Sequence, residues 1–147
     1  MADLPGAVLF ACTMNAIRSP MAEGILKMLL GKRLYVDSVG LRKGELDPFA
    51  VAVMDEIGID ITRHRAKTFD NLEDSSFDVI VTLSPEAHHR ALELTRTMAC
   101  EVELWNTLDP SIIEGSRETR LDAYRAVRDT LMRRIRARFP TAAGPQV

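Results

Sequence analysis

Short apolar runs alternate with helix-start signals along this chain, and this alternation limits its fold more than any other feature. Four segments have the composition of buried strands: 7–11, 34–39, 79–83 and 101–105. Each of the first three is followed by a pair typical of a helix N-cap and first turn: Ser19-Pro20, Asp47-Pro48 and Ser84-Pro85. The pattern predicts right-handed βαβ units, and therefore an α/β fold with a parallel sheet and helices on both faces.

Glycines, prolines and apolar spacing set the expected ends of the helices. Gly31 and Gly58 are expected to end the first two helices, and the third is expected to continue to about Met98. A final helix that ends before Pro140 is predicted by apolar residues spaced three or four apart: Leu121, Tyr124, Val127, Leu131 and Ile135. Because no linker or repeat interrupts the chain, we expect one domain over residues 1–140 and a frayed tail over 141–147.

Composition narrows the functional classes. The 147 residues carry a net charge of −2, whereas proteins that bind nucleic acid or membrane surfaces need a basic excess. No apolar run approaches the ~20 residues of a membrane span. Cys12 and Cys100 are the only cysteines, which fits neither a disulfide framework nor a zinc site. We therefore expect a cytoplasmic protein without a bound metal, a nucleic-acid partner or a membrane partner.

The segment that joins the first strand to the first helix carries the chemistry. Cys12 ends the strand, and Arg18 follows six residues later, directly before Ser19. A segment this short must curl to begin a helix at Ser19, so several backbone N–H groups converge at a helix N-terminus. Arg18 adds a planar fork of donors that suits a tetrahedral oxyanion. The sequence thus predicts oxyanion capture followed by nucleophilic attack by Cys12.

The stretch VLFACTMNAIRSPMAE, residues 8–23, resembles the signature of the low-molecular-weight protein tyrosine phosphatases and of the related thioredoxin-coupled arsenate reductases. The resemblance continues through further segments: VDSVG at 36–40, residues 47–67, FDVIVTL at 77–83 and LDP at 108–110. It implies a flavodoxin-like three-layer sandwich with a four-stranded parallel sheet in the order 2-1-3-4. It also implies a phosphocysteine mechanism that uses no metal or organic cofactor.

The resemblance assigns a role to each of four side chains. Cys12 attacks phosphorus, while Arg18 holds the equatorial oxygens. Ser19 is expected to cap the helix and to donate its hydroxyl to the thiolate, which eases the departure of the thiolate in the second step. Asp109 is expected to protonate the leaving oxygen and then to deprotonate the attacking water.

The five residues inside the loop are expected to bind phosphate, sulfate or arsenate through their amides: Thr13, Met14, Asn15, Ala16 and Ile17. Asn15 is expected to brace the loop from a left-handed backbone, with Ser38 in support. Met14 replaces a family glycine, so it is either strained by a positive φ or narrows the mouth of the site. Ile17 replaces a second loop cysteine of many family phosphatases.

Other departures keep the function open. A phosphotyrosine slot needs aromatic walls, but residues 41–46 and Ser111-Ile112 supply none. The two redox cysteines of the arsenate reductases fall near Ser84 and Ala91, and Cys100 is expected to be structural. The expected function is hydrolysis of phosphomonoesters of the phosphotyrosine type, in a protein or a small molecule. The alternatives are arsenate reduction with an external thiol, or oxyanion binding in a regulatory protein with little turnover.

Several prominent side chains have structural interpretations. His64 is expected to be a turn or rim residue, and His88-His89 a solvated pair, because adjacent helical residues diverge by ~100°. The arginines of the final helix are expected to form a solvated face, and Trp105 is expected to pack near a strand end. We expect a monomer or a weak dimer.

Overall fold

The computed structural model describes residues 4–72 and 76–140. Its centre is a parallel sheet in the order β2-β1-β3-β4. The strands are short and unevenly exposed: β1 (Ala7–Cys12), β2 (Tyr35–Gly40), β3 (Val79–Thr82) and β4 (Glu101–Leu104). The register pairs Cys12 with Gly40, Ala11 with Thr82 and Val79 with Glu101. The flavodoxin-like fold and the strand order predicted from the sequence are both confirmed.

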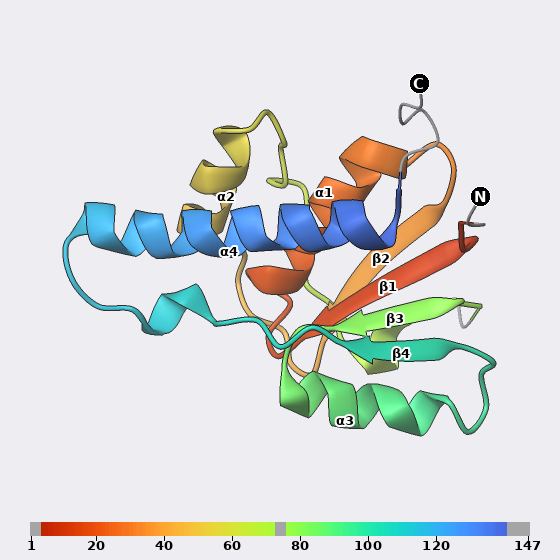
Figure 1. Ribbon diagram of the computed structural model, residues 1–147. Coiled ribbons are helices and arrows are strands. Elements are labelled where there is room, and N and C mark those ends of the chain that lie inside the picture. The colour runs from red at the N-terminus through yellow and green to blue at the C-terminus, as the bar shows by residue number, and fades with distance from the viewer. Residues whose placement is uncertain (1–3, 73–75, 141–147) are drawn as a thin grey trace.

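Helices cover the two faces of the sheet unequally (Figure 1). One face carries α1 (Arg18–Leu30), α2 (Pro48–Asp55) and α4 (Arg117–Arg138), and the other carries α3 (Pro85–Leu94). Two short 3-10 turns complete the order, η1 (Phe69–Asn71) and η2 (Pro110–Ile112). Alternate residues of β1 enter the two cores, since Phe10 packs with the α1 side and Leu9 with the α3 side.

The N-cap predictions have mixed outcomes. Asp47 caps α2 by accepting from the backbone N–H of Phe49, and Ser84 caps α3 by accepting from Ala87. The prediction that Ser19 caps the first helix is wrong, because α1 already begins at Arg18 and its N-cap position is Ile17. The loop curls directly into the helix, so the Ser19 hydroxyl lies inside the first turn and is available for other partners.

Two helices also end earlier than the sequence predicts. The third helix stops at Leu94 instead of Met98, because the Thr95 hydroxyl donates to the carbonyl of Leu92 and the chain tightens into a turn. The second helix stops at Asp55, and Gly58 follows with a φ of +79°. The predicted frayed tail, 141–147, lies outside the described residues.

The arginine-rich helix α4 is only partly the solvated face that the sequence predicts. Arg128 is buried, and it donates to the carbonyl of Val53 and to Glu56. Arg125 binds the same carboxylate with two nitrogens. These bonds hold the pKa of Glu56 down, at about 2. They join the long final helix to the end of α2.

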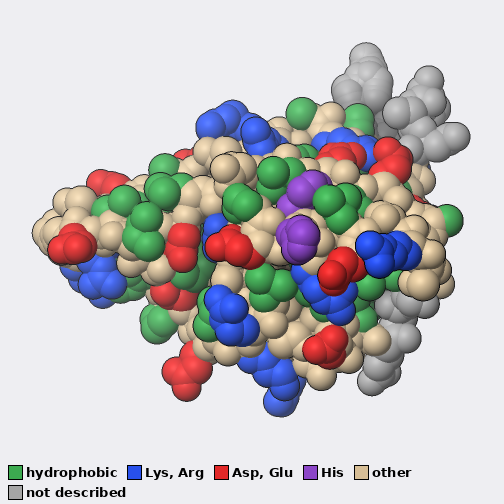
Figure 2. Space-filling view, turned by 90° about the horizontal axis from the view of Figure 1, so that it is seen from below, with side chains coloured by type: hydrophobic (Ala, Val, Ile, Leu, Met, Phe, Trp, Pro, Cys, Tyr) green, Lys and Arg blue, Asp and Glu red, His purple; other side chains and the backbone are tan. Residues whose placement is uncertain are grey.

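Acidic and basic side chains are interspersed over the α3 side of the molecule, with histidine side chains near the centre of the view (Figure 2).

The prediction that His88 and His89 form a solvated pair is only half correct. The Nδ1 atom of His88 lies 2.9 Å from the Thr82 hydroxyl. His89 is exposed. In the described part of the chain, no helix is long and apolar enough to cross a membrane.

Candidate active site

The loop from Cys12 to Arg18 lies at the carboxyl end of β1, and its carbonyl groups point outward. The carbonyls of Cys12, Thr13 and Met14 accept from the N–H groups of residues 41, 42 and 44, and that of Ala16 accepts from Asp47. Gly40 makes this approach feasible, because a Cβ there would lie 2.6 Å from the backbone nitrogen of Asn15. The connection between β2 and α2 therefore shapes the outer side of the loop.

The loop amides consequently face inward. In a trans peptide the N–H points opposite to the preceding carbonyl, and the described residues contain no cis peptide bond. Within the described ranges, no N–H group of residues 13–17 donates to another protein group. Asn15 has a φ of +54°, which curls the chain as the sequence predicts. The result is a concave set of free donors at the N-terminus of α1, which suits an anion.

Cys12 and Arg18 lie on this inner side. The Sγ atom of Cys12 is 2.9 Å from the Ser19 hydroxyl, and Cys12 is 2% exposed. The Arg18 guanidinium is also buried, and its Nη1 donates to the carbonyl of Thr107 at 2.9 Å. Arg18 thus links the anion-binding loop to the segment that leads to Asp109.

Asp109 lines the same cavity as Cys12 and Arg18. The cavity has a volume of about 260 Å³, and both Cys12 and Asp109 line it. The Oδ1 atom of Asp109 accepts from the backbone N–H and the hydroxyl of Ser111, at 2.9 and 2.7 Å. These bonds fix the carboxylate at the start of η2 and leave its other oxygen free of these donors. The structure therefore brings a thiol, a guanidinium, inward amides and a carboxylate to one small cavity.

A buried network holds the loop from behind, and Asn15 is its centre. The Nδ2 atom of Asn15 donates to Ser19 at 2.8 Å and to Ser38 at 3.0 Å. Its Oδ1 atom lies 3.0 Å from both His64 Nε2 and the backbone nitrogen of Lys67, which donates to it. Asn15 is fully buried. Ser38 is thus a support for the loop rather than a wall of the cavity.

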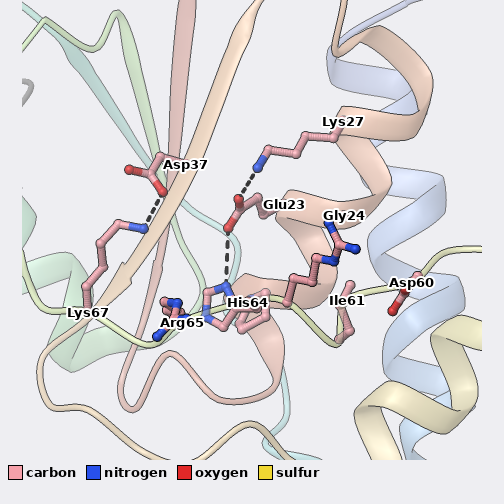
Figure 3. Close-up of a pocket in the computed structure, with 11 residues that line it drawn as sticks. Glu23, Gly24, Lys27, Asp37, Asp60, Ile61, His64, Arg65 and Lys67 are labelled. Atoms are coloured by element: carbon pink, nitrogen blue, oxygen red, sulfur yellow. Dashed lines mark hydrogen bonds and ion pairs between the residues drawn. The ribbon is translucent and has the colours of Figure 1, made fainter.

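The network continues to side chains that line a second cavity, of about 370 Å³ (Figure 3). The carboxylate of Glu23 accepts from Ser38 at 2.5 Å and pairs with Lys27. His64 Nδ1 faces Glu23 at 3.7 Å, beyond hydrogen-bond distance. Burial lowers the pKa of His64 despite this carboxylate. Because the Oδ1 atom of Asn15 can only accept, the Nε2 atom of His64 is the donor in this contact.

Sequence reasoning missed Glu23 and was half correct for His64. The N–H of His64 closes a turn by donating to the carbonyl of Ile61, but His64 is not a rim residue, because its side chain is 8% exposed and contacts the loop. The role of Glu23 could have been found from the sequence, because Ser19 and Glu23 are four residues apart and share one face of α1. Nothing near Lys67 in the sequence signals its contact with Asn15.

Met14 and Trp105 resolve two open points. Asn15, not Met14, is the non-glycine residue with a positive φ in the described chain, so Met14 is unstrained. Its side chain is 38% exposed and lines the mouth of the cavity, which it narrows. Trp105 packs edge-on against Phe10, with ring centroids 6.3 Å apart, as predicted.

Two other features of the chain add little to the site: the second cysteine and the possible metal ligands. Cys100 directly precedes β4 and packs against the core beneath α3, and burial raises the pKa of its thiol. Across the described residues, no group of three or more His, Cys, Asp or Glu side chains could hold a metal ion.

Comparison with known proteins identifies the family. A family model described as low molecular weight phosphotyrosine protein phosphatase matches residues 7–142. The chain belongs to this family. Similar proteins are also named for a different activity, arsenate reduction. An arsenate reductase of Halalkalibacterium halodurans is 36% identical over 130 residues, which cover 88% of this chain and 91% of the relative. An arsenate reductase of Bacillus subtilis is 33% identical over 129 residues, which cover 88% and 91%.

Solved structures of the family agree with the fold. An arsenate reductase in a phosphate-binding state is 29% identical, with a TM-score of 0.69 and coverage of 89% of this chain and 94% of that one. The tyrosine phosphatase AmsI of Erwinia amylovora is 23% identical, with a TM-score of 0.72 and coverage of 88% of each chain. The second likeness concerns the fold alone.

Proposed function

We propose that this protein hydrolyses phosphomonoesters through a phosphocysteine intermediate. The observation that carries the proposal is the single cavity that holds Cys12, Arg18 and Asp109. An oxyanion-binding protein needs inward amides and a guanidinium, but it needs neither a nucleophile nor an acid. Membership of the phosphotyrosine phosphatase family supports the same activity.

Each step uses a group of the cavity. The thiolate of Cys12 attacks phosphorus, and the ester bond to the leaving oxygen breaks as Asp109 gives that oxygen a proton. Arg18 and the loop amides hold the three equatorial oxygens. Water then attacks the phosphocysteine, Asp109 takes a proton from it, and inorganic phosphate leaves. The Ser19 hydroxyl, 2.9 Å from sulfur, stabilises the departing thiolate.

The family suggests the substrate class, and the walls of the cavity limit how the substrate can be held. No aromatic side chain lines the cavity among the described residues, so a phosphotyrosine ring would be held through its phosphate and not by stacking. A phosphorylated protein or a small phosphomonoester of the phosphotyrosine type remains the substrate class we propose. We also propose that the protein acts in the cytoplasm, as a monomer or a weak dimer.

Arsenate reduction is the second candidate, because relatives at 36% and 33% identity are named arsenate reductases. It needs a second thiol to take Cys12 to a disulfide. The register places Cys100 level with Asp78 and Cys12 level with Leu83. Five residues along a strand separate them by about 16 Å, too far for a disulfide. The second thiol would therefore have to be an external one.

Hydrolysis of para-nitrophenyl phosphate between pH 5 and 7 tests the proposal. We expect Cys12→Ser to abolish turnover, Asp109→Asn to reduce it strongly, and Cys100→Ser to leave it unchanged. A folded wild-type protein that binds phosphate without turnover would contradict the proposal. Arsenate with an added low-molecular-weight thiol is then the next assay, and failure there as well would indicate a protein that only binds oxyanions.

A further inference from the structure

The charge of the catalytic cavity is unusual for a site that receives a phosphate dianion. Three acidic side chains line it, from Glu45, Asp47 and Asp109, the last of which carries the proton for the leaving oxygen in the proposed function. Arg18 is the one Lys or Arg side chain among the described residues that line the cavity. Arg18 lies beside the nucleophile and is committed to the phosphoryl group in the proposed function. The wall that contacts the rest of the substrate is therefore acidic and carries no compensating cation.

Asp47 is the fixed member of this acidic wall. Its Oδ1 atom accepts from the backbone N–H groups of Phe49 and Ala50, at 2.7 and 3.4 Å. Its Oδ2 atom accepts from the Tyr124 hydroxyl at 2.8 Å. The backbone N–H of Asp47 donates to the carbonyl of Ala16 at 3.1 Å. The carboxylate is thus tied to α2, to α4 and to the anion-binding loop.

These contacts hold the Asp47 side chain in place. Three donors bind its two carboxylate oxygens at the N-terminus of α2. Tyr124 is 1% exposed. Its pKa is raised first by burial, then by its bond to Asp47, and further by the negative charges of Asp47 and Asp109. The phenol is thereby held as a neutral donor beneath the cavity.

The nearby cations of other elements do not line the cavity. Arg120 and Arg117 of α4 lie over the Phe49 ring, 4.6 and 5.1 Å from its centroid. Arg42 and Lys43 precede the cavity-lining Gly44 but are not among the lining residues. Glu45 is exposed at the rim, so its charge adds to that of Asp47.

We infer that Asp47 is a specificity-determining residue that selects phosphomonoesters whose leaving group carries a positive charge. This inference rests on the proposed function. A cationic leaving group is attracted by the acidic wall, whereas a leaving group with a carboxylate is repelled by it. Removing one carboxylate changes the attraction and the repulsion together. Across a water-exposed cavity, this lowers the preference for the cationic substrate by about fivefold.

Two aryl phosphates of similar size test the inference, one with a para aminomethyl group and one with a para carboxylate. We expect the wild type to show a higher kcat/KM for the ammonium substrate, by about tenfold at low salt. Asp47→Asn can keep the N-cap contact while it removes the charge, and we expect it to lower this ratio about fivefold. Glu45→Gln is the matched control at the exposed rim, with a smaller decrease.

Two further readouts separate an electrostatic role from a structural one. Raising the ionic strength should shrink the wild-type ratio, because charges at an open cavity are screened. Tyr124→Phe removes a donor but keeps the charge of Asp47, so it should lower the melting temperature and leave the ratio in place. An equal ratio in the wild type and Asp47→Asn would overturn the inference, as would a ratio that is insensitive to salt.

The same pair of compounds distinguishes failure of this inference from failure of the proposed function. Binding of both to Cys12→Ser, measured by calorimetry, requires no turnover. If the wild type hydrolyses neither compound, the proposed function fails. A preference for the ammonium compound in binding would then still support the acidic wall, and equal binding of the two would overturn it.

Discussion

Replacing Asn15 by alanine tests whether the buried network behind the loop holds the site together. The amide makes four contacts: Ser19 Oγ at 2.8 Å, Ser38 Oγ at 3.0 Å, and His64 Nε2 and the Lys67 nitrogen at 3.0 Å each. Each net hydrogen bond contributes about 1 kcal/mol, so four contribute about 4 kcal/mol. Alanine in the left-handed backbone at φ +54° costs about 1 kcal/mol more.

Part of this loss is recovered by other partners. Ser19 lies 3.4 Å from the carbonyl of Val39, and Ser38 already donates to Glu23. His64 Nε2 keeps the backbone carbonyl of residue 15, 3.2 Å away, whereas the part-buried N–H of Lys67 gains no new acceptor within the described structure. We therefore expect Asn15→Ala to lower the free energy of unfolding by about 3–4 kcal/mol, a large share of the usual 5–15 kcal/mol.

Urea unfolding measures this change directly. A loss of about 3 kcal/mol lowers the midpoint by roughly 1–2 M and the melting temperature by about 6–12 °C. Phosphate affinity should fall as well, because the inward amides lose their support. Asn106→Ala, at an exposed position, is the matched control and should change stability by less than about 0.5 kcal/mol. If Asn15→Ala and Asn106→Ala have the same urea midpoint, the network does not stabilise the loop.

Three other substitutions test separate parts of the structure. Gly40→Ala places a Cβ 2.6 Å from a backbone nitrogen of the loop, so phosphate affinity should fall at least tenfold by calorimetry, whereas Gly6→Ala, which meets one carboxylate oxygen at 3.2 Å, should retain it. Met14→Gly should widen the mouth and lower KM for bulky aryl phosphates, with kcat unchanged; an unchanged KM contradicts this. Glu56 has a pKa lowered from 4.5 to about 2, so its contribution to stability is present above pH 4.5 and is lost as the pH falls toward 2. The unfolding free energies of wild type and Glu56→Gln should therefore differ at pH 6 and converge near pH 2, and a constant difference would refute the linkage.

The parts of the fold that local chemistry decides could be predicted from the sequence. Continuous apolar runs identified β1 and β3, and Asp47 and Ser84 capped helices where Asx-Pro and Ser-Pro pairs stood. The same rule failed at Ser19, because the curled loop begins its helix two residues earlier, with Ile17 at the N-cap position. There the tertiary demand of the anion-binding loop overrode the cap preference, and the hydroxyl turned to Cys12 instead.

The loop itself was predictable and its supports were not. Cys12, Arg18 and the turn at Asn15 lie within seven residues, so their spacing alone encodes a cradle for an oxyanion. The contacts of Asn15 with His64 and Lys67 span 49 and 52 residues. They exist because the segment after α2 returns along β2, where the Gly40 N–H donates to the Lys67 carbonyl. Only the sheet topology creates that approach.

The inferred acidic wall gives a functional reason for the charge of Asp47, a residue whose place in the sequence helix capping already explains. An aspartate before a proline at a helix start needs no role beyond capping, and Asp47 does cap α2. Yet its second oxygen binds Tyr124, 77 residues away, and the same carboxylate lines the cavity of Cys12. A cap requires one acceptor oxygen and works as well with a neutral asparagine. Charge at this position is therefore the property that capping leaves unexplained, and the ratio of rates for cationic and anionic leaving groups is the measurement that isolates it.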